Sequence, residues 1–241
     1  MAEMTMNEQV RAVAFQLLLK TRGPVSIATL ANELGPARNQ VEAEVAQLDR
    51  QGLIRRNPGG DVVGSAGLSV VPSRHELHIG DQRFWTWCAY DAVGILAALG
   101  ASGRVLSASP LDGAPIEVRV RGGLPEQSDV VLFMPDFFTA GTEGAPWPEA
   151  GVSVFDDWCP QINFFQDRAA SLAWAEQRGV RGQVLSLPDA ARRGATRWQP
   201  VVSSPPALSG RPLSLTVRDR EDEGSNPSPP TKIRIQNRLV R

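Results

Sequence analysis

Three residues, Cys88, Asp91 and Cys159, carry the side chains best suited to metal and proton chemistry. The 241-residue chain has two cysteines, and each lies in an aromatic-rich stretch, at residues 84–91 and 155–165. Asp91 follows Cys88 by about one helical turn, so in a helix the thiol and the carboxyl would share a face. Two soft sulfur ligands and one acid are suited to binding a soft metal ion and delivering a proton.

The pKa values of these groups depend on where they lie in the fold. A helix that opens at Cys88 would lower the pKa of its thiol, because the free N–H groups of the helix N-terminus favour thiolate. Burial among aromatic residues would raise the pKa of Asp91, so that its carboxyl serves as a general acid near neutral pH. These aromatic residues are Trp85, Trp87 and Tyr90. Alternatively, Cys88 is a small buried hydrophobic residue and Asp91 an ordinary first-turn acid.

The metal that this pair of cysteines suits best is mercury(II), which favours linear coordination by two sulfurs. A closed tetrahedral zinc site needs further ligands, and the chain has two histidines, His75 and His78. Both lie in a predicted strand at a spacing that points their side chains to opposite faces, so we interpret them as structural or surface residues. The sequence contains no Cys-x-x-Cys, His-Glu-x-x-His, Gly-x-Gly-x-x-Gly or phosphate-loop motif.

The elements that must position these residues are predicted as an α+β fold. An apolar helix over residues 87–99, ended by Gly100, follows a region of alternating strands at residues 67–83. Further strands are predicted at residues 104–109, 115–121, 130–134, 162–165 and 184–187, a helix at 171–177, and a short helix around Ala190. Because these elements do not alternate as regular βαβ units, we expect a mixed α/β domain with mostly antiparallel strands.

Residues 1–66 are predicted to form a winged-helix-like module. Apolar spacing predicts three helices, the second capped by Ser26 and the third over residues 37–51, and the turn at residues 57–60 predicts a hairpin. A winged helix binds DNA through its third helix. Here the first half of that helix carries two acids and one arginine, whereas a phosphate-facing helix should be more basic. The alternative is a structural or substrate-covering module.

Composition limits the remaining possibilities. The chain has 25 Lys+Arg and 26 Asp+Glu, a formal net charge of −1, so charge gives no argument for nucleic acid or an anionic membrane as partner. No apolar run reaches bilayer length and the start lacks a secretory pattern, so we interpret the cysteines as reduced thiols of a cytoplasmic protein. Residues 67–200 are expected to form the cysteine-bearing domain, and residues 201–241, rich in Pro, Ser and charge, a disordered tail.

The two cysteine segments resemble those of the organomercurial (alkylmercury) lyases. Residues 81–92 are similar to the signature of that family, in which a Trp-Cys-Ala-x-Asp core supplies the first catalytic cysteine and the catalytic aspartate. Residues 155–165 are similar to the segment with the second catalytic cysteine, and residues 173–176 and 179–182 also match. The resemblance covers residues 8–200, including the winged-helix-like module that these lyases share.

The resemblance implies protonolysis of a carbon–mercury bond in mercury detoxification. Cys88 and Cys159 would hold the mercury of the organomercurial substrate, and Asp91, also close to the metal, would move a proton to the carbon. Residues 67–200 would then be the catalytic lyase domain. The products would be a hydrocarbon and Hg(II), passed to small thiols or to a mercuric reductase. No cofactor is implied, because mercury is substrate and product and only free thiols are needed to remove it.

Two features depart from the family pattern. Members often carry two additional, non-catalytic cysteines, whose counterparts here are Ser109 and Pro160, and a histidine where this chain has residues 162–163. Two alternatives to a lyase therefore stay open at this point. One is a thiol-based metal-sensing transcription regulator with a winged helix, and the other is a lyase-like protein recruited to another pathway.

Overall fold

Three helices open the described part of the chain, and a polar side chain caps the start of the first two. The structure is a computed structural model that describes residues 4–136 and 152–203. The helices are α1 (Met6–Thr21), α2 (Ile27–Leu34) and α3 (Arg38–Arg50). Ser26 caps α2 as predicted, accepting a hydrogen bond from Thr29 N–H through its side chain. The predicted apolar face of α3 is buried, at Val41, Val45 and Leu48.

The predicted hairpin follows and begins a large antiparallel sheet. β1 (Ile54–Arg56) pairs with β2 (Val62–Ser65), and the sheet has the order β1-β2-β3-β5-β4-β6-β7-β8. The remaining strands are β3 (Leu68–Ser69), β4 (His75–Ile79), β5 (Gln82–Thr86), β6 (Gly103–Ala108), β7 (Pro115–Arg121) and β8 (Leu124–Pro125). Because β2 pairs with β3, the sheet continues across the predicted domain boundary after residue 66.

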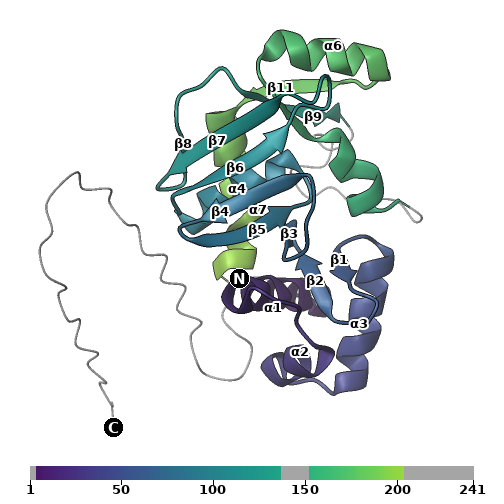
Figure 1. Ribbon diagram of the computed structural model, residues 1–241. Coiled ribbons are helices and arrows are strands. Elements are labelled where there is room, and N and C mark those ends of the chain that lie inside the picture. Colours follow the sequence, from purple (N-terminus) through teal and green to yellow (C-terminus); the bar gives the residue numbers. More distant parts are fainter. Residues whose placement is uncertain (1–3, 137–151, 204–241) are drawn as a thin grey trace, which may run out of the picture.

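A second, three-stranded antiparallel sheet lies at the end of the molecule away from α1–α3 (Figure 1). Its order is β10-β9-β11, and the helix α6 packs on it. The bounds are β9 (Val131–Pro135), β10 (Asn163–Phe165), α6 (Arg168–Arg178) and β11 (Gly182–Ser186). Phe133, Phe165 and Trp174 form its small apolar cluster. The predicted mixed α/β domain with mostly antiparallel strands is therefore confirmed.

The helix α4 (Ala89–Leu99) packs against the last described helix, α7 (Leu187–Ser203), on one side of the large sheet (Figure 1). The predicted helix around Ala190 is present, but it is longer than expected, because α7 has 17 residues. Its buried residues recur at helical spacing, but most are alanine or glycine, and Pro200 lies inside the helix, so the pattern did not reveal its full length. The helix also runs past the predicted start of the tail, and residues 204–241 lie outside the described range.

One large cluster of buried side chains connects these parts. It runs from Leu18 in α1 and Val45 in α3, through Leu68 in the sheet, to Val93 in α4 and Trp198 in α7. Burial of such side chains is the main stabilising contribution to the fold. Among the helices in the described ranges, none is long and apolar enough to cross a membrane.

Candidate active site

Cys88 and Asp91 are joined by reciprocal hydrogen bonds at the first turn of α4. The Sγ of Cys88 accepts the backbone N–H of Asp91 at 3.4 Å, and Oδ2 of Asp91 accepts the backbone N–H of Cys88 at 2.9 Å. This is a capping box in which cysteine takes the place that serine or threonine usually holds. Local sequence therefore places the thiol and the carboxyl together, as the spacing predicts.

Cys159 reaches the same place from a short irregular segment. A π-helical turn, η1 (Val154–Trp158), leads into a 3₁₀ turn, η2 (Cys159–Gln161), and then into β10. The N–H of Ala89 in α4 donates to the carbonyl of Ile162 at 3.2 Å, which ties this segment to the start of α4. Single π-helical turns are frequent at functional sites because they redirect a side chain locally.

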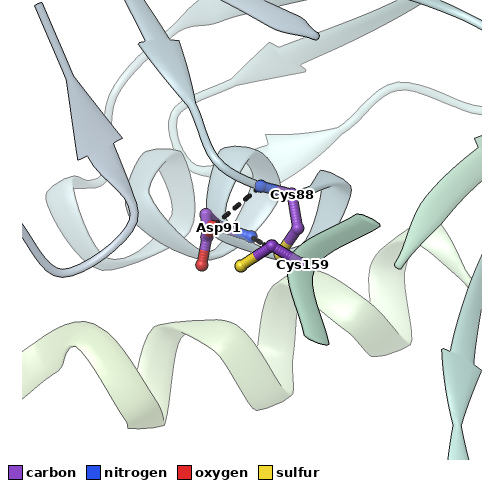
Figure 2. A group of neighbouring side chains, drawn as sticks. All are labelled: Cys88, Asp91 and Cys159. Atoms are coloured by element: carbon purple, nitrogen blue, oxygen red, sulfur yellow. Dashed lines mark hydrogen bonds between the residues drawn. The ribbon is translucent and has the colours of Figure 1, made fainter. Parts of the chain in front are cut away.

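The three side chains meet in the interior of the protein (Figure 2). The Sγ atoms of Cys88 and Cys159 and a carboxylate oxygen of Asp91 all lie within 4.8 Å of one another. The exposed fractions are 2% for Cys88, 7% for Asp91 and 4% for Cys159. Thiolate–metal bonds are about 2.3 Å long, so one metal atom can contact both sulfurs with small side-chain movements.

Burial dominates the electrostatics of Asp91. Loss of solvent raises the pKa of its carboxyl to about 6, against an ordinary value of 3.8. The hydrogen bonds from Cys88 act in the opposite direction, as do the charges of Arg11 on α1 and Arg197 on α7. A carboxyl with this pKa can both accept and return a proton near neutral pH.

Both thiols are held in the protonated form. Burial raises the pKa of Cys88 well above its ordinary value, and the hydrogen bond with Cys159 and the negative charge of Asp91 raise it further. The helix N–H of Asp91 does lower this pKa, as predicted, but desolvation of the thiolate is larger, so the net change is an increase. At Cys159 the hydrogen bond from Cys88 lowers the pKa, but burial and the charges of Asp91 and Asp156 give a net increase.

The histidines lie apart from this cluster, as their strand spacing predicts. In β4, His75 is buried and His78 half-buried, so they face opposite sides of the sheet. The Nδ1 of His75 bonds to Ser107 Oγ at 2.9 Å, and burial lowers the pKa of its ring to about 3. Nε2 of His78 contacts Glu76 at 2.7 Å.

Two residues that the sequence analysis did not single out as site residues hold the turn that carries Cys159. Arg74 Nη1 donates to the Pro160 carbonyl at 3.1 Å, and it also bonds to the side chain of Asn163. The Asn163 amide donates to the same carbonyl at 2.9 Å and is fully buried. Their spacing, with Arg74 about 90 residues before Asn163, gives no local signal of this role. Ser109, by contrast, lies in the β6–β7 turn, where its Oγ accepts the N–H of Leu111.

Two buried thiols and a carboxyl of raised pKa, on an antiparallel α/β scaffold, are the groups expected in a protein that binds a thiophilic metal and transfers a proton beside it. A protein-family model described as alkylmercury lyase (MerB) matches residues 68–199, more than half of this chain. The chain therefore belongs to the alkylmercury lyase family, enzymes that cleave carbon–mercury bonds. This match favours neither the metal-sensing regulator nor recruitment to another pathway.

Individual relatives agree with the family match. The alkylmercury lyase of Streptomyces lividans is 29% identical over 180 residues, which cover 74% of this chain and 77% of the relative. The alkylmercury lyase of Bacillus cereus is 26% identical over 178 residues, covering 73% and 76%. A crystal structure of the mercury-bound form of MerB2 has the same fold, with a TM-score of 0.70 at 23% identity over 83% of this chain and 94% of that one.

Proposed function

We propose that this chain cleaves organomercurials by protonolysis, with Cys88 and Cys159 as the mercury ligands and Asp91 as the proton carrier. The observation that carries this proposal is the meeting of two buried sulfurs and one carboxyl within 4.8 Å at the start of α4. Soft thiolates are the protein ligands that bind mercury most strongly. In this proposal the mercury binds to the sulfurs of Cys88 and Cys159, and the proton is carried by the Asp91 carboxyl.

The pKa order of the three groups supports this assignment. In the free enzyme both thiols carry their protons, whereas the Asp91 pKa of about 6 leaves most of its carboxyl ionised at neutral pH. When mercury bonds to a sulfur, the thiol becomes far more acidic and loses its proton. The Asp91 carboxylate is close enough to take that proton, and it can then donate it to the carbon bound to mercury.

The overall reaction balances without a change in oxidation state. An organomercurial thiolate R–Hg–SR′ and two protein thiols give a hydrocarbon RH, mercury(II) held by two cysteine sulfurs, and a free thiol R′SH. One thiol proton goes to the carbon through Asp91, and the other goes to the departing thiolate. Two sulfur ligands increase electron density on the carbon, so that the Hg–C bond is cleaved by a proton without an added reductant.

This balance requires no cofactor, since the mercury enters with the substrate and the proton comes from the protein. We propose that small thiols, or a mercuric reductase, remove Hg(II) from Cys88 and Cys159 in a cytoplasmic detoxification route. Both sulfurs are nearly fully buried. An acceptor thiol must therefore reach mercury through a local opening at the site.

We also propose that residues 1–66 form a winged-helix-like module attached to a catalytic domain that extends from residue 67 to the end of α7 at Ser203. The three helices and the β1–β2 hairpin support this description. The module is proposed to support the site, because Gly52 at its edge lies directly against the segment that leads to Cys159. Nucleic acid is not the partner we propose, since α3 carries Glu42 and Glu44 on its exposed side.

The function is tested by hydrocarbon release. Purified protein is incubated with phenylmercury or methylmercury and an excess of thiol, and benzene or methane is measured in the headspace. We expect catalytic release and, without added thiol, one mercury retained per protein. No hydrocarbon from well-folded wild-type protein would contradict the proposed function. A gel-shift assay with and without mercury tests the regulator alternative independently.

A further inference from the structure

The tight turn between β2 and β3 lies directly against the Asp91 carboxyl. Ser65 pairs with Leu68, so the loop consists of Ala66 and Gly67, with positive φ angles of 49° and 87°. These angles are those of the two-residue hairpin turn that matches strand twist. A Cβ atom placed on Gly67 would lie 2.5 Å from Oδ1 and 2.8 Å from Cβ of Asp91. The turn backbone therefore packs directly against the Asp91 carboxyl, and position 67 has room only for glycine.

This turn is held from both sides by buried hydrogen bonds. The indole N–H of Trp198, in α7, donates to the carbonyl of Ala66 at 2.8 Å. The backbone N–H of Trp87 donates to the carbonyl of Gly67 at 3.0 Å. The first bond joins residues 132 positions apart in the chain. A helix near the end of the described chain therefore fixes the position of a turn that contacts Asp91.

Trp198 is itself fixed by a close helix crossing. A Cβ on Gly194 of α7 would lie 3.2 Å from the backbone N of Gly94 in α4, so the two helices approach through glycine. A Cβ on Gly94 would lie 2.6 Å from the Trp198 ring, which therefore packs on the α4 backbone about one turn after Asp91. The ring also meets Tyr90 edge-on, with centroids 5.3 Å apart.

We propose that Trp198 and Gly67 are positioning residues for Asp91. The Cys88 N–H holds Oδ2 of the carboxyl, whereas Oδ1 faces the Gly67 backbone. Trp198 keeps the turn in place. The turn in turn restricts rotation of the Asp91 carboxyl, so that it stays in one orientation beside the two sulfurs. This inference rests on the proposed function, in which that orientation delivers a proton to the carbon on mercury.

The main test is Trp198→Phe, which removes the indole N–H and keeps an aromatic ring against Gly94 and Tyr90. Because small misplacements of a reacting group reduce rate strongly, we expect kcat for benzene release to fall about 10-fold. The KM for phenylmercury and the number of mercury atoms bound per protein should change by less than about twofold, since both sulfurs keep their places. The matched control is Trp174→Phe, a buried tryptophan in the small cluster beside α6, which should leave kcat within about twofold.

A second pair of variants tests the turn without altering the helix crossing. Gly67→Ala places a methyl group against the carboxyl, and Gly60→Ala has the same backbone strain, at φ angles of 87° and 88°, with open space around its Cβ. We expect Gly67→Ala to reduce kcat by about 10-fold or more and Gly60→Ala to leave it unchanged. This pair carries the test if Trp198→Phe does not fold.

A measurement without substrate separates this inference from the proposed function. If the turn orients Asp91, hydrogen exchange of the Cys88 amide should be faster in Trp198→Phe and unchanged in Trp174→Phe, because that amide donates to Asp91. A kcat for Trp198→Phe equal to wild type, or equal losses of kcat in both tryptophan variants, would overturn the inference. Wild-type protein without lyase activity but with this exchange pattern would contradict the proposed function alone.

Discussion

The two cysteines lie in one cluster, but different kinds of structure hold them. Cys88 stands at the junction of β5 and α4, where a capping box of consecutive residues fixes the thiol and its acid. Cys159 stands in two short irregular turns that have no long helix or strand to fix them. The pairing of Cys88 with Asp91 is therefore determined locally, although contacts with Gly67 also limit the orientation of the carboxyl. The position of Cys159 depends on contacts from other parts of the chain.

Those contacts come mainly from the β1 end of the large sheet. The carbonyl of Gln51 accepts the N–H of Val154 at 3.2 Å. Because Gly52 has no side chain, it leaves space for the backbone of Val154 and Phe155. Arg55 lies over the ring of Phe155 at 3.9 Å and pairs with Asp156 at 3.7 Å. Changes at Gln51, Gly52 or Arg55 should therefore act on Cys159 and leave the Cys88–Asp91 pair intact.

The largest effect is expected from replacing either sulfur. Cys88→Ser and Cys159→Ser should each reduce hydrocarbon release by roughly 10³-fold or more, because a hydroxyl is a poor mercury ligand and the groups act as a unit. Headspace assays measure the loss. Serine also caps helices well, so the thermal stability of Cys88→Ser should stay close to wild type. Substantial turnover by Cys159→Ser would show that one sulfur suffices and would end the two-thiolate mechanism.

Asp91→Asn should separate proton transfer from mercury binding. We expect turnover to fall about 10²-fold, because the amide keeps the acceptor for the Cys88 N–H but cannot deliver a proton. Mercury bound per protein, measured by metal analysis after removal of excess reagent, should be unchanged. Loss of mercury binding together with turnover would instead make Asp91 a required ligand.

The stability difference between wild type and the same variant should depend on pH. The folded-state pKa of Asp91 is raised from 3.8 to about 6, so its contribution to stability is present below the lower value and lost as pH rises through the higher one. The loss is about 3 kcal/mol at most. Asp91→Asn should therefore be more stable than wild type at pH 8 and similar to it at pH 4, by urea unfolding. An equal difference at both pH values would contradict the raised pKa.

Gly52→Ala tests the support of Cys159 from the N-terminal module. The added methyl group would lie 2.9 Å from the backbone N atoms of Val154 and Phe155, at a φ of 67°. We expect stability to fall by about 1–2 kcal/mol and turnover by about 10-fold. The matched control is Gly80→Ala, with a φ of 60° and open space. If both variants keep full activity, the module does not position Cys159.

The smallest effect is expected from Arg55→Met, which keeps the apolar part of the side chain. Its ion pair with Asp156 is largely exposed, so we expect a stability loss of about 0.5–1 kcal/mol, most of it from the contact with Phe155. Turnover should fall by less than about threefold. Arg119→Met, which removes a surface ion pair with Glu117 in β7, is the control and should leave turnover unchanged.

Most of the regular elements could be predicted from the sequence. Caps and apolar spacing gave α2, α3 and α4, and the turns at residues 57–60 and 112–113 gave the hairpins β1–β2 and β6–β7. These signals are local, because a cap or a turn involves residues within about one helical turn of each other. The length of α7 was missed because its buried face is made mostly of alanine and glycine, and Pro200, inside the helix, is a residue that usually ends one.

The sequence by itself determined which residues are candidates for the chemistry, since two cysteines in aromatic segments and an acid one turn after the first define a small set of side chains. Only the tertiary structure decided that Cys159 meets Cys88 and Asp91, that burial raises the pKa of both thiols, and that Gly67 and Trp198 stand behind the carboxyl. The reason is physical. Residue type and helical spacing are fixed along the chain, whereas desolvation and contacts between distant segments exist only once the chain has packed.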